Sequence, residues 1–426
     1  MNDAASGYPD SYYAATANGL VAPTPLDGST SADVCIIGAG FTGLSTALHL
    51  RELGHDVVLL EARRVGWGAS GRNGGQVGSG QRKDEAELEQ RFGLDSAREL
   101  WNLAQDAKAL VRELVTRHQI DCDLSDGMLI VAHKPAAARE LADRAGRLAG
   151  AYGYHDMRYV PRAELHDMLA SADFHGGLLD AGAMHLHPLN YALGLARACR
   201  EAGVRVHEQT PVLDYSRSDP AVVRTARGNV QAKQVVVACN AYLEKLEPRL
   251  AGRIMPINNF VIATAPLAEP RALIRDGVCV QDTRFVVNYF RLSADGRLLF
   301  GGGENYRRRF PRDIAAFVRP YLLRIFPQLA ATPVDFAWGG ALAVTLSRLP
   351  HVGRLAPNVL FAQGFSGHGV PTATLAGKLI AGAIAGDATG FERFASLPVR
   401  PFPGGTLLRW PGLVAGMLWY GLRDRF

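Results

Sequence analysis

The first strong pattern along the chain is an apolar strand, a helix and a second strand near the N-terminus. The stretch ADVCIIG (32–38) is continuously apolar, as a parallel strand covered on both faces must be. Apolar residues recur at helical spacing over 41–53, Gly54 ends that helix, and HDVVLLE (55–61) is the second strand. The first 30 residues hold prolines and small polar residues, which predict an extended arm.

The pattern changes after residue 83. Residues 84–119 keep helical spacing and predict one long helix, GMLIVA (127–132) predicts a strand, and 136–151 predicts another helix. Between 253 and 303 the stretches RIMPINNFVIATAP, RFVVNYF and GRLLFGGG alternate or run apolar in short pieces, which is typical of an antiparallel sheet.

Parallel-type units return later in the chain. Residues 187–212 predict a helix and then strands, 232–242 a buried strand, and the stretch from Asn358 a strand, a glycine turn and a helix. We therefore predict an α/β fold (α+β overall), in which a Rossmann-like parallel-sheet domain is interleaved with an antiparallel-sheet domain. The predicted segments are an arm at 1–30, the parallel-sheet domain at 31–82, 180–247 and 343–395, the antiparallel-sheet domain at 83–179 and 248–342, and an apolar tail at 396–426.

Composition changes this picture little. A chain of 426 residues with 48% apolar and 20% charged residues is long enough for two globular domains. The net charge of +5 is spread thinly, and the run RRR at 307–309 predicts a solvated surface, so we expect no nucleic-acid partner.

The five scattered cysteines lack metal-ligand spacing, and we expect neither disulfides nor a metal site. A polar N-terminus without a signal pattern adds to the expectation of a cytoplasmic protein.

The C-terminal stretch TLLRWPGLVAGMLWYGLRDRF is apolar and aromatic. Arg409 and Pro411 interrupt it, so it falls short of the ~20 continuous apolar residues that a membrane span needs. We expect this tail to pack on the protein or on a partner subunit, with peripheral contact to a membrane surface as the alternative. The sequence leaves the oligomeric state open.

The turn after the first strand carries a nucleotide-binding motif. GAGFTG places Gly38, Gly40 and Gly43 in the pattern G-x-G-x-x-G, whose glycines make the turn, admit a pyrophosphate and let the helix pack on the strand. The helix N-terminus offers N–H groups and a partial positive charge to the phosphates. Glu61 ends the second strand, where a carboxylate accepts hydrogen bonds from ribose hydroxyls. Together these features predict a bound dinucleotide.

A second glycine-rich loop, GWGASGRNGGQV (66–77), follows closely. A flavin ring beyond the pyrophosphate needs N–H donors, and glycines let a backbone approach a flat ring. The side chains of Ser70, Arg72, Asn73 and Gln76 can serve the ring edge and the pyrophosphate. The loop therefore favours a flavin as the dinucleotide.

On these motifs the sequence resembles the FAD-dependent oxidoreductases of the D-amino-acid oxidase and sarcosine oxidase superfamily, and more closely their γ-glutamylputrescine oxidase branch. The stretches GAGFTGLSTALHLRELGHDVVLLEARRVGWGASGRNGGQV, HLHPLNYALGLARA, WGGALAVTLSRLPHVGRL and NVLFAQGFSGHGV carry the resemblance, which covers nearly the whole chain. It implies a Rossmann-like FAD-binding domain and noncovalent FAD, because no cysteine or histidine stands at a matched covalent-flavin position. The FAD-binding residues that it implies are Gly38, Ala39, Gly40, Phe41, Thr42, Gly43, Glu61, Ala62, Arg63, Gly68, Ala69, Ser70, Arg72, Asn73, Gly74, Gly75, Gln76, Val212, Asn240, Gly364, Phe365, Gly367, His368 and Gly369.

The resemblance also implies where the parts of FAD lie. Glu61 takes the adenosine ribose, and the backbone at Val212 contacts the adenine. Toward the ring, GFSGHG (364–369) precedes a helix that we expect to begin near Pro371, and its N-terminus can stabilise negative charge developing on the flavin. Asn240 is expected to line the same channel.

The sequence departs from the amino-acid oxidases of this superfamily at one position. Those enzymes hold the substrate carboxylate with an arginine in a motif resembling G-x-R-P-x-T-x-D-x-x-P-x-x-G, and here GALAVTLSRLPHVG carries Leu342 at that place. A buried carboxylate left without its partner loses ~3–5 kcal/mol. We therefore expect poor activity on α-amino acids, and activity on an amine without a neighbouring carboxylate, such as γ-glutamylputrescine.

The resemblance implies oxidation of a primary amine. The amine carbon transfers a hydride to flavin N5, the imine hydrolyses to an aldehyde and ammonia, and dioxygen is the expected electron acceptor. No catalytic residue is assigned, because a neutral amine needs no acid or base. The candidates for the substrate wall are Trp338, Tyr289, Arg291, Gln76 and Leu342. The two aromatic residues fit a core role equally well, and Arg291 could meet a distal carboxylate or form a surface salt bridge.

Two other functions stay open. One is a membrane-linked D-amino-acid or secondary-amine dehydrogenase that passes electrons to quinone; the apolar tail favours it, and Leu342 opposes its amino-acid version. The other is a non-catalytic flavoprotein, whose flavin no amine would reduce.

Overall fold

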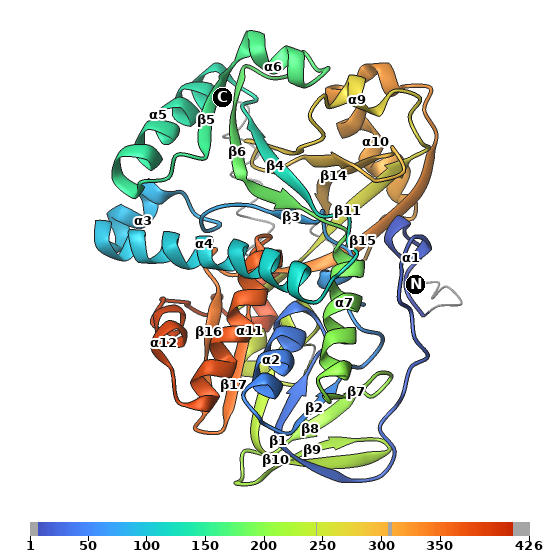
Figure 1. Ribbon diagram of the computed structural model, residues 1–426, viewed down its shortest axis with the longest axis vertical. Coiled ribbons are helices and arrows are strands. Elements are labelled where there is room, and N and C mark those ends of the chain that lie inside the picture. The colour runs from blue at the N-terminus through green and yellow to red at the C-terminus, as the bar shows by residue number, and fades with distance from the viewer. Residues whose placement is uncertain (1–6, 244, 306–308, 412–426) are drawn as a thin grey trace.

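Two β-sheets organise the chain, and helices cover them (Figure 1). The computed structural model describes residues 7–243, 245–305 and 309–411. In Figure 1 the first sheet lies in the lower half, the second in the upper half, and helix α4 crosses the middle. The helices are α1 (Tyr12–Ala15), α2 (Phe41–Glu52), α3 (Glu85–Phe92), α4 (Leu94–Arg117), α5 (Pro135–Tyr152), α6 (Arg162–Met168), α7 (Pro188–Glu201), α8 (Pro248–Ala251), α9 (Pro270–Leu273), α10 (Ile314–Ile325), α11 (Gly369–Ala385) and α12 (Thr389–Ala395), with short 3-10 helices η1 (Ala69–Gly71), η2 (Asn240–Tyr242) and η3 (Pro327–Leu329).

The first sheet collects strands from the beginning, the middle and the end of the chain. Its order is β16-β17-β10-β1-β2-β7, parallel from β17 to β7, with β16 antiparallel at one edge. The hairpin of β8 and β9 extends from β10. Its strands are β1 (Thr30–Ile37), β2 (Val57–Leu60), β7 (Arg205–His207), β8 (Val212–Tyr215), β9 (Ala221–Thr225), β10 (Gly228–Val237), β16 (His351–Ala356) and β17 (Val359–Gln363). This arrangement confirms the predicted Rossmann-like α/β fold.

The apolar runs at 34–37 of β1 and over the whole of β2 have a direct cause. Successive side chains of a strand point to opposite faces, and both faces of this sheet are covered. Ile36 and Leu59 pack in one core with α2, α7 and α11. Cys35 and Val58 pack on the other face, in a core with Val223 of β9. Four central strand residues are therefore fully buried, and neither face tolerates a polar residue.

The second sheet has the order β15-β11-β14-β13-β12-β4-β6-β3, with β5 paired to β6. All its pairs are antiparallel except β12 with β4. The predicted antiparallel sheet is thus present in the chain. Its strands are β3 (Gln76–Val77), β4 (Ser125–Val131), β5 (Met157–Pro161), β6 (Gly176–His185), β11 (Met255–Thr264), β12 (Cys279–Asp282), β13 (Tyr289–Leu292), β14 (Leu298–Asn305) and β15 (Val334–Val344).

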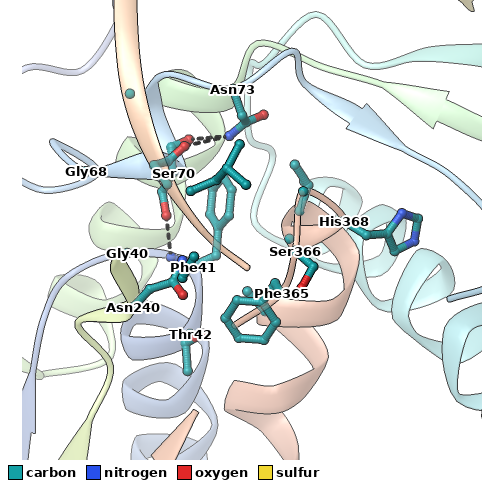
Figure 2. A pocket seen from close by; sticks show the side chains of 18 of the residues that line it. Gly40, Phe41, Thr42, Gly68, Ser70, Asn73, Asn240, Phe365, Ser366 and His368 are labelled. Atoms are coloured by element: carbon teal, nitrogen blue, oxygen red, sulfur yellow. Dashed lines mark hydrogen bonds between the residues drawn. The ribbon is translucent and has the colours of Figure 1, made fainter. Parts of the chain in front are cut away.

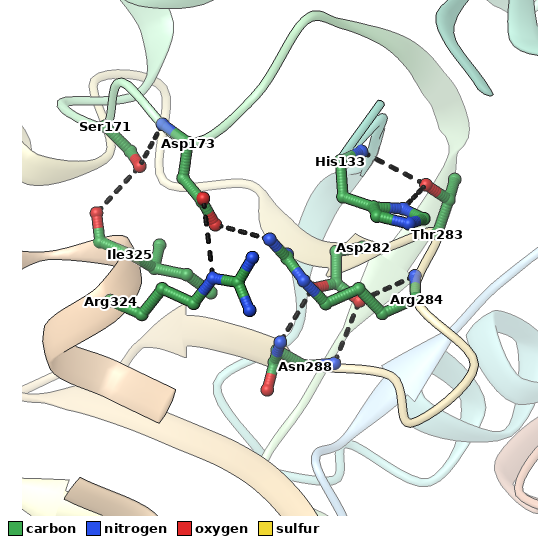
Figure 3. A network of polar contacts seen from close by, with 9 residues as sticks. All are labelled: His133, Ser171, Asp173, Asp282, Thr283, Arg284, Asn288, Arg324 and Ile325. Atoms are coloured by element: carbon green, nitrogen blue, oxygen red, sulfur yellow. Dashed lines mark hydrogen bonds and ion pairs between the residues drawn. The ribbon is translucent and has the colours of Figure 1, made fainter. Parts of the chain in front are cut away.

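Residues 283–288 form a turn and not the strand that the apolar sequence predicts. The buried carboxylate of Asp282 accepts hydrogen bonds from the backbone N–H groups of Arg284 (3.2 Å) and Asn288 (3.0 Å) (Figure 3). It also accepts from Asn288 Nδ2 (2.7 Å) and from Arg284 Nη1 (2.6 Å), and Arg284 pairs with Asp173 at 2.7 Å. These charge-assisted contacts close the turn. Those of Asp282 are local in sequence, and Asp173 adds a partner from a distant segment that the apolar pattern does not reveal.

The single helix predicted over 84–119 is two helices, α3 and α4. Gly93 separates them with a φ of 82°, a left-handed conformation that glycine adopts without strain. Asp84 caps α3 by accepting a hydrogen bond from the N–H of Ala86. The apolar spacing continues across the break, and this is why periodicity alone missed it.

The N-terminal segment is not simply an extended arm. Residues 12–15 form α1, and Tyr8, Tyr12 and Tyr13 are all buried. The Tyr8 hydroxyl donates to the carbonyl of Val65 (2.8 Å), and the Tyr12 hydroxyl donates to Asp295 (2.7 Å). Three aromatic rings supply far more apolar area than the neighbouring small residues, and that area anchors the segment.

The predicted segment boundaries differ from the sheets in four places. β3 belongs to the second sheet although its residues fall within 31–82. β6 runs across the boundary placed at 179/180, β15 runs across the one at 342/343, and β1 begins at residue 30, inside the predicted arm. Arg307, Arg308 and residues 412–426 of the apolar tail lie outside the described residues. Among the residues that are described, no helix is long and apolar enough to cross a membrane.

Candidate active site

A cavity of about 1250 Å³ lies between the two sheets, at the carboxyl ends of β1 and β2. This volume exceeds the ~300–1000 Å³ of pockets for drug-sized ligands and suits a larger molecule. The predicted residues that line the cavity are Gly38, Ala39, Gly40, Phe41, Thr42, Glu61, Ala62, Arg63, Gly68, Ala69, Ser70, Arg72, Asn73, Gly74, Gln76, Val212, Asn240, Phe365, Gly367, His368, Gly369, Tyr289 and Leu342. The predicted residues outside its lining are Gly43, Gly75, Gly364, Trp338 and Arg291.

The turn between β1 and α2 leaves space that side chains would fill. Gly38 has a φ of 108°, and a Cβ there would lie 2.8 Å from the carbonyl oxygen of Ala238. A Cβ on Gly40 would lie 2.8 Å from Ser70 Oγ, and one on Gly43 would lie 1.9 Å from the carbonyl oxygen of Gly38. Gly43 therefore serves the close packing of helix on strand, while the other two glycines leave the start of α2 open to the cavity, where it can receive phosphates.

Glu61 occupies the end of β2 at the cavity wall. Its two carboxylate oxygens accept hydrogen bonds from the N–H groups of Ala39 and Arg63, each at 2.8 Å. Burial raises the pKa of Glu61, and these two N–H groups act in the opposite direction. Val212 lines the same part of the cavity, so a carboxylate and a backbone edge are available for a nucleoside.

The glycine-rich loop holds itself in place with its own side chains (Figure 2). Asn73 Nδ2 donates to the carbonyls of Ala69 and Ser70, both at 3.0 Å, and its Oδ1 accepts from the N–H of Gly75 (2.7 Å). Ser70 Oγ accepts from the N–H of Phe41 at the start of α2 (3.0 Å). Asn73 therefore shapes the loop that lines the cavity, although the sequence predicts that it contacts the ligand.

Arg72 also binds within the protein. Its Nε donates to the carbonyl of Trp67 (2.6 Å), its Nη1 donates to the carbonyl of Gly339 (3.2 Å), and the guanidinium lies 4.0 Å from the Trp67 ring centroid. Trp67 lines the cavity, and its buried indole N–H has no hydrogen-bond partner among the described residues. An acceptor on a bound ligand would satisfy this donor, which is evidence that the cavity is built for a polar molecule.

Arg291 and Trp338 lie behind the glycine-rich loop and not at the substrate wall. Arg291 is 3% exposed and donates to the carbonyls of Gly74 (Nε, 3.0 Å) and Leu186 (Nη2, 3.0 Å). It therefore makes no surface salt bridge and cannot reach a substrate carboxylate. Trp338 is buried, and its indole N–H donates to the carbonyl of Arg72 (3.1 Å). Both side chains brace the loop from its far side.

The other side of the cavity is formed by residues 364–369 and the start of α11. Asn240, held at a φ of 46°, accepts a hydrogen bond through Oδ1 from the N–H of Gly364 (2.9 Å). This bond ties the end of β10 to the end of β17. Helix α11 begins at Gly369, two residues before the predicted Pro371, so its first N–H groups lie at the cavity.

His368 precedes α11, and its ring points away from Gly40, Ser70 and Asn73 in Figure 2. Burial, helped by the charge of Arg82, lowers the pKa of His368 to about 4. The imidazole is therefore neutral near pH 7 and contributes no positive charge to the ligand.

The second sheet supplies a substrate-side wall. Tyr289 lines the cavity and its hydroxyl donates to Asn259 Oδ1, while Gln76 Nε2 donates to the carbonyl of Val280 (2.9 Å). Met128 and Ile130 of β4 also line it and were not predicted. Because they are two residues apart in a strand, both side chains lie on the same face of β4. Only the packing of the whole molecule shows that this face meets the cavity.

A buried polar network next to this wall was also missed. Lys108 of α4 donates to Ser79 Oγ (2.5 Å), to the Tyr154 hydroxyl (2.9 Å) and to the carbonyl of Gly182 (3.1 Å). Asp180, which lines the cavity, accepts from Ser79 and Tyr154, each at 2.6 Å. Burial lowers the pKa of Lys108, and the carboxylate of Asp180 opposes that shift. The network joins α4 to β6 and fixes one edge of the cavity.

Comparison with known proteins identifies the ligand that this cavity is built for. The family model of FAD dependent oxidoreductases (DAO) matches residues 33–383. The chain is 46% identical over 418 residues to the gamma-glutamylputrescine oxidoreductase of Escherichia coli strain K12, covering 97% of this chain and 98% of that protein. It is 41% identical over 402 residues to the probable oxidoreductase OrdL of Rhizobium meliloti, covering 94% of each.

A solved structure shows the same fold. The crystal structure of glycine oxidase from Geobacillus kaustophilus matches with a TM-score of 0.73 at 23% identity, covering 88% of this chain and 100% of that one. The open helix start, the terminal carboxylate and the two glycine-lined walls fit FAD. The chain belongs to the DAO family of FAD-dependent oxidoreductases and is an oxidoreductase with FAD as its cofactor.

Proposed function

We propose that the protein oxidises the primary amine of a γ-glutamylated diamine such as γ-glutamylputrescine. The observation that carries this proposal is the apolar wall at Leu342. Leu342 of β15 lies opposite Ile257 of β11, and both side chains line the cavity. A carboxylate next to the reacting carbon would lose its water against this wall and gain no cation there, which is unfavourable. The relative from Escherichia coli that is named for γ-glutamylputrescine supports the same substrate.

The chain's own residues would bind and orient the amine. The alkyl part of the substrate fits between Tyr289, Leu342 and the side chains of β4. Bound FAD supplies the two-electron oxidation of the carbon–nitrogen bond, and water then converts the imine to an aldehyde and ammonia. Negative charge would develop on the bound flavin as it is reduced. The N–H groups at the start of α11, which lie at the cavity, would stabilise that charge. No side chain has to remove a proton from a neutral amine.

We also propose that FAD is held noncovalently by the lining residues predicted from the sequence. Cys239 is the cysteine at the cavity wall, and burial raises the pKa of its thiol to about 12, so it is not a ready nucleophile. Its Sγ donates to the carbonyl of Ile37 (3.4 Å). The His368 ring points away from the labelled loop residues in Figure 2. These positions support a dissociable cofactor.

Rapid anaerobic mixing tests the substrate. The FAD-loaded protein is mixed separately with γ-glutamylputrescine, putrescine, sarcosine and D-alanine while the visible flavin absorbance is followed. Fast bleaching by γ-glutamylputrescine alone is the expected result. Bleaching by D-alanine or sarcosine at a comparable rate would show that the wall at Leu342 does not exclude a carboxylate and would overturn the proposal.

Aerobic turnover tests the electron acceptor, for which we propose dioxygen. Hydrogen peroxide should form at the rate of amine consumption in air alone. Turnover that requires an added quinone would instead support a dehydrogenase.

A further inference from the structure

Arg348 lies at the cavity wall in the connection between β15 and β16. Its backbone has a φ of 58°, a conformation that residues other than glycine seldom adopt. The surrounding structure holds it there: the N–H of Arg348 donates to the carbonyl of Thr345 (3.1 Å), and Thr345 Oγ1 donates to the carbonyl of Leu349 (2.8 Å). These two hydrogen bonds within the turn at 345–349 thus set the direction in which the Arg348 side chain leaves the chain.

The guanidinium of Arg348 meets the turn at 283–288. Its Cζ lies 5.5 Å from the ring centroid of Phe285, within the range of a cation–π contact. The base of that turn is fixed by Asp282 and Arg284 (Figure 3), and Val287 from the same turn lines the cavity. Arg348 therefore sits on the second-sheet side of the cavity, whereas Glu61 and Val212 belong to the first sheet.

The other cations in the described lining of the cavity are engaged by protein groups or lie toward the first sheet. Lys83 pairs with Glu87 and Arg144 pairs with Glu85. Arg72 and Arg82 donate to backbone carbonyls. Arg63 and Lys245 belong to the first-sheet side, because Arg63 comes two residues after Glu61 and Lys245 is next to Leu246, which packs against the first-sheet core. Within the described ranges, the guanidinium of Arg348 forms no hydrogen bond and no ion pair with a carboxylate.

We propose that Arg348 binds the carboxylate of the γ-glutamyl group, at the end of the substrate opposite the amine that reacts. This inference rests on the function proposed above. A planar guanidinium can hold a carboxylate with two parallel hydrogen bonds, and the cation–π contact with Phe285 uses none of its N–H groups. Leu342 lies six positions before Arg348, in β15, and gives an apolar wall to the end of the substrate that carries the reacting amine. The cavity thus separates the place where the carboxylate binds from the place where the amine reacts.

Paired substrates and variants test this assignment. γ-Glutamylputrescine and N-acetylputrescine share the reacting amine and the amide, and only the first carries a carboxylate. Arg348→Met keeps an unbranched stem without charge and should lower kcat/KM for γ-glutamylputrescine by ~10–100-fold, chiefly through KM, because a charge-assisted contact is lost. The value for N-acetylputrescine should stay within about twofold. Arg348→Lys should fall between Arg348→Met and the wild type, because it keeps the charge and loses the fork.

A matched control uses Arg139, an exposed arginine of α5. Arg139→Met changes the net charge equally and should leave the ratio of kcat/KM values for the two substrates unchanged. If Arg348→Met keeps the wild-type ratio, or lowers both values equally, the assignment of Arg348 is wrong while the proposed substrate stands. If the wild type already uses both substrates equally well, carboxylate recognition is absent, and both the γ-glutamyl proposal and the role of Arg348 fail.

Discussion

Replacement of Arg291 by methionine is expected to destabilise the protein and loosen its hold on FAD. The guanidinium makes two hydrogen bonds of 3.0 Å to the carbonyls of Gly74 and Leu186, inside a site that is 3% exposed. A hydrogen bond from a charged donor contributes ~1.5–3 kcal/mol, so the two together amount to ~3–6 kcal/mol. We expect the lower half of this range, because the substitution also removes a buried charge whose desolvation opposes folding.

Two measurements check this expectation. Urea denaturation followed by circular dichroism gives the change in free energy of unfolding, and titration of the apoprotein with FAD, followed by flavin fluorescence, gives the dissociation constant. Arg291→Met should raise the FAD dissociation constant, since Gly74 lies in the loop that lines the cavity. Arg291→Lys should be almost as damaging, because an ammonium group cannot span both carbonyls. Arg139→Met serves as the exposed control and should change stability by less than ~0.5 kcal/mol.

The reasoning is refuted if Arg291→Met loses less than ~1 kcal/mol of stability, the size of a single ordinary hydrogen bond. It is also refuted if the variant keeps normal stability and normal FAD affinity but discriminates against γ-glutamylputrescine relative to N-acetylputrescine. That pattern would place Arg291 at the distal carboxylate, as the sequence allowed, and would remove the need for Arg348.

Three further predictions concern the cofactor site. Gly43→Ala should cost ~3 kcal/mol or more in urea denaturation, because its Cβ would lie 1.9 Å from the carbonyl oxygen of Gly38, whereas Gly146→Ala, with no atom within 4 Å, should be neutral or slightly stabilising. Glu61→Gln should raise the FAD dissociation constant ~10–100-fold in a fluorescence titration, and an unchanged value would remove Glu61 from the ribose site. The pKa of His368 is about 4 in the folded state, below its unfolded value of ~6.5. The stability that its neutral form contributes is therefore present above pH 6.5 and is lost as the pH falls toward 4. His368→Asn should flatten the dependence of the free energy of unfolding on pH between 4 and 6.5 and leave that dependence unchanged above pH 7.

Local sequence patterns were enough to predict the nucleotide-binding half of the fold. The apolar runs of β1 and β2 indicated a sheet covered on both faces, and Gly38, Gly40 and Glu61 stand at the edge where a dinucleotide binds. Each of these signals extends over a few neighbouring residues. The steric requirements of one turn and the burial of one strand determine these signals. They can therefore be recognised without knowledge of the rest of the molecule.

The same patterns failed where two distant segments meet. Arg291 and Trp338 have the residue types of a binding site, but contacts with the glycine-rich loop place them behind it. The buried Tyr8 likewise packs far from its neighbours in sequence and donates to the carbonyl of Val65, which anchors a segment that its neighbours mark as extended. The turn at 283–288 has a nearer cause, because Asp282 binds the N–H groups of Arg284 and Asn288. For Arg291 and Trp338 the outcome depends on which distant carbonyls they reach after the chain has packed.

The sequence by itself therefore determined the fold class, the flavin cofactor and the apolar character of the wall at Leu342. Only the tertiary structure decided which cations face the cavity, because a cation's availability depends on its partners. Arg291 lies in β13 and Arg348 follows β15, both strands of the second sheet. The guanidinium of Arg291 is bound by backbone carbonyls, whereas that of Arg348 makes a cation–π contact with Phe285 at the cavity wall. Hydrogen bonds to carbonyls that are distant in the sequence made that difference, and no local sequence pattern predicts them.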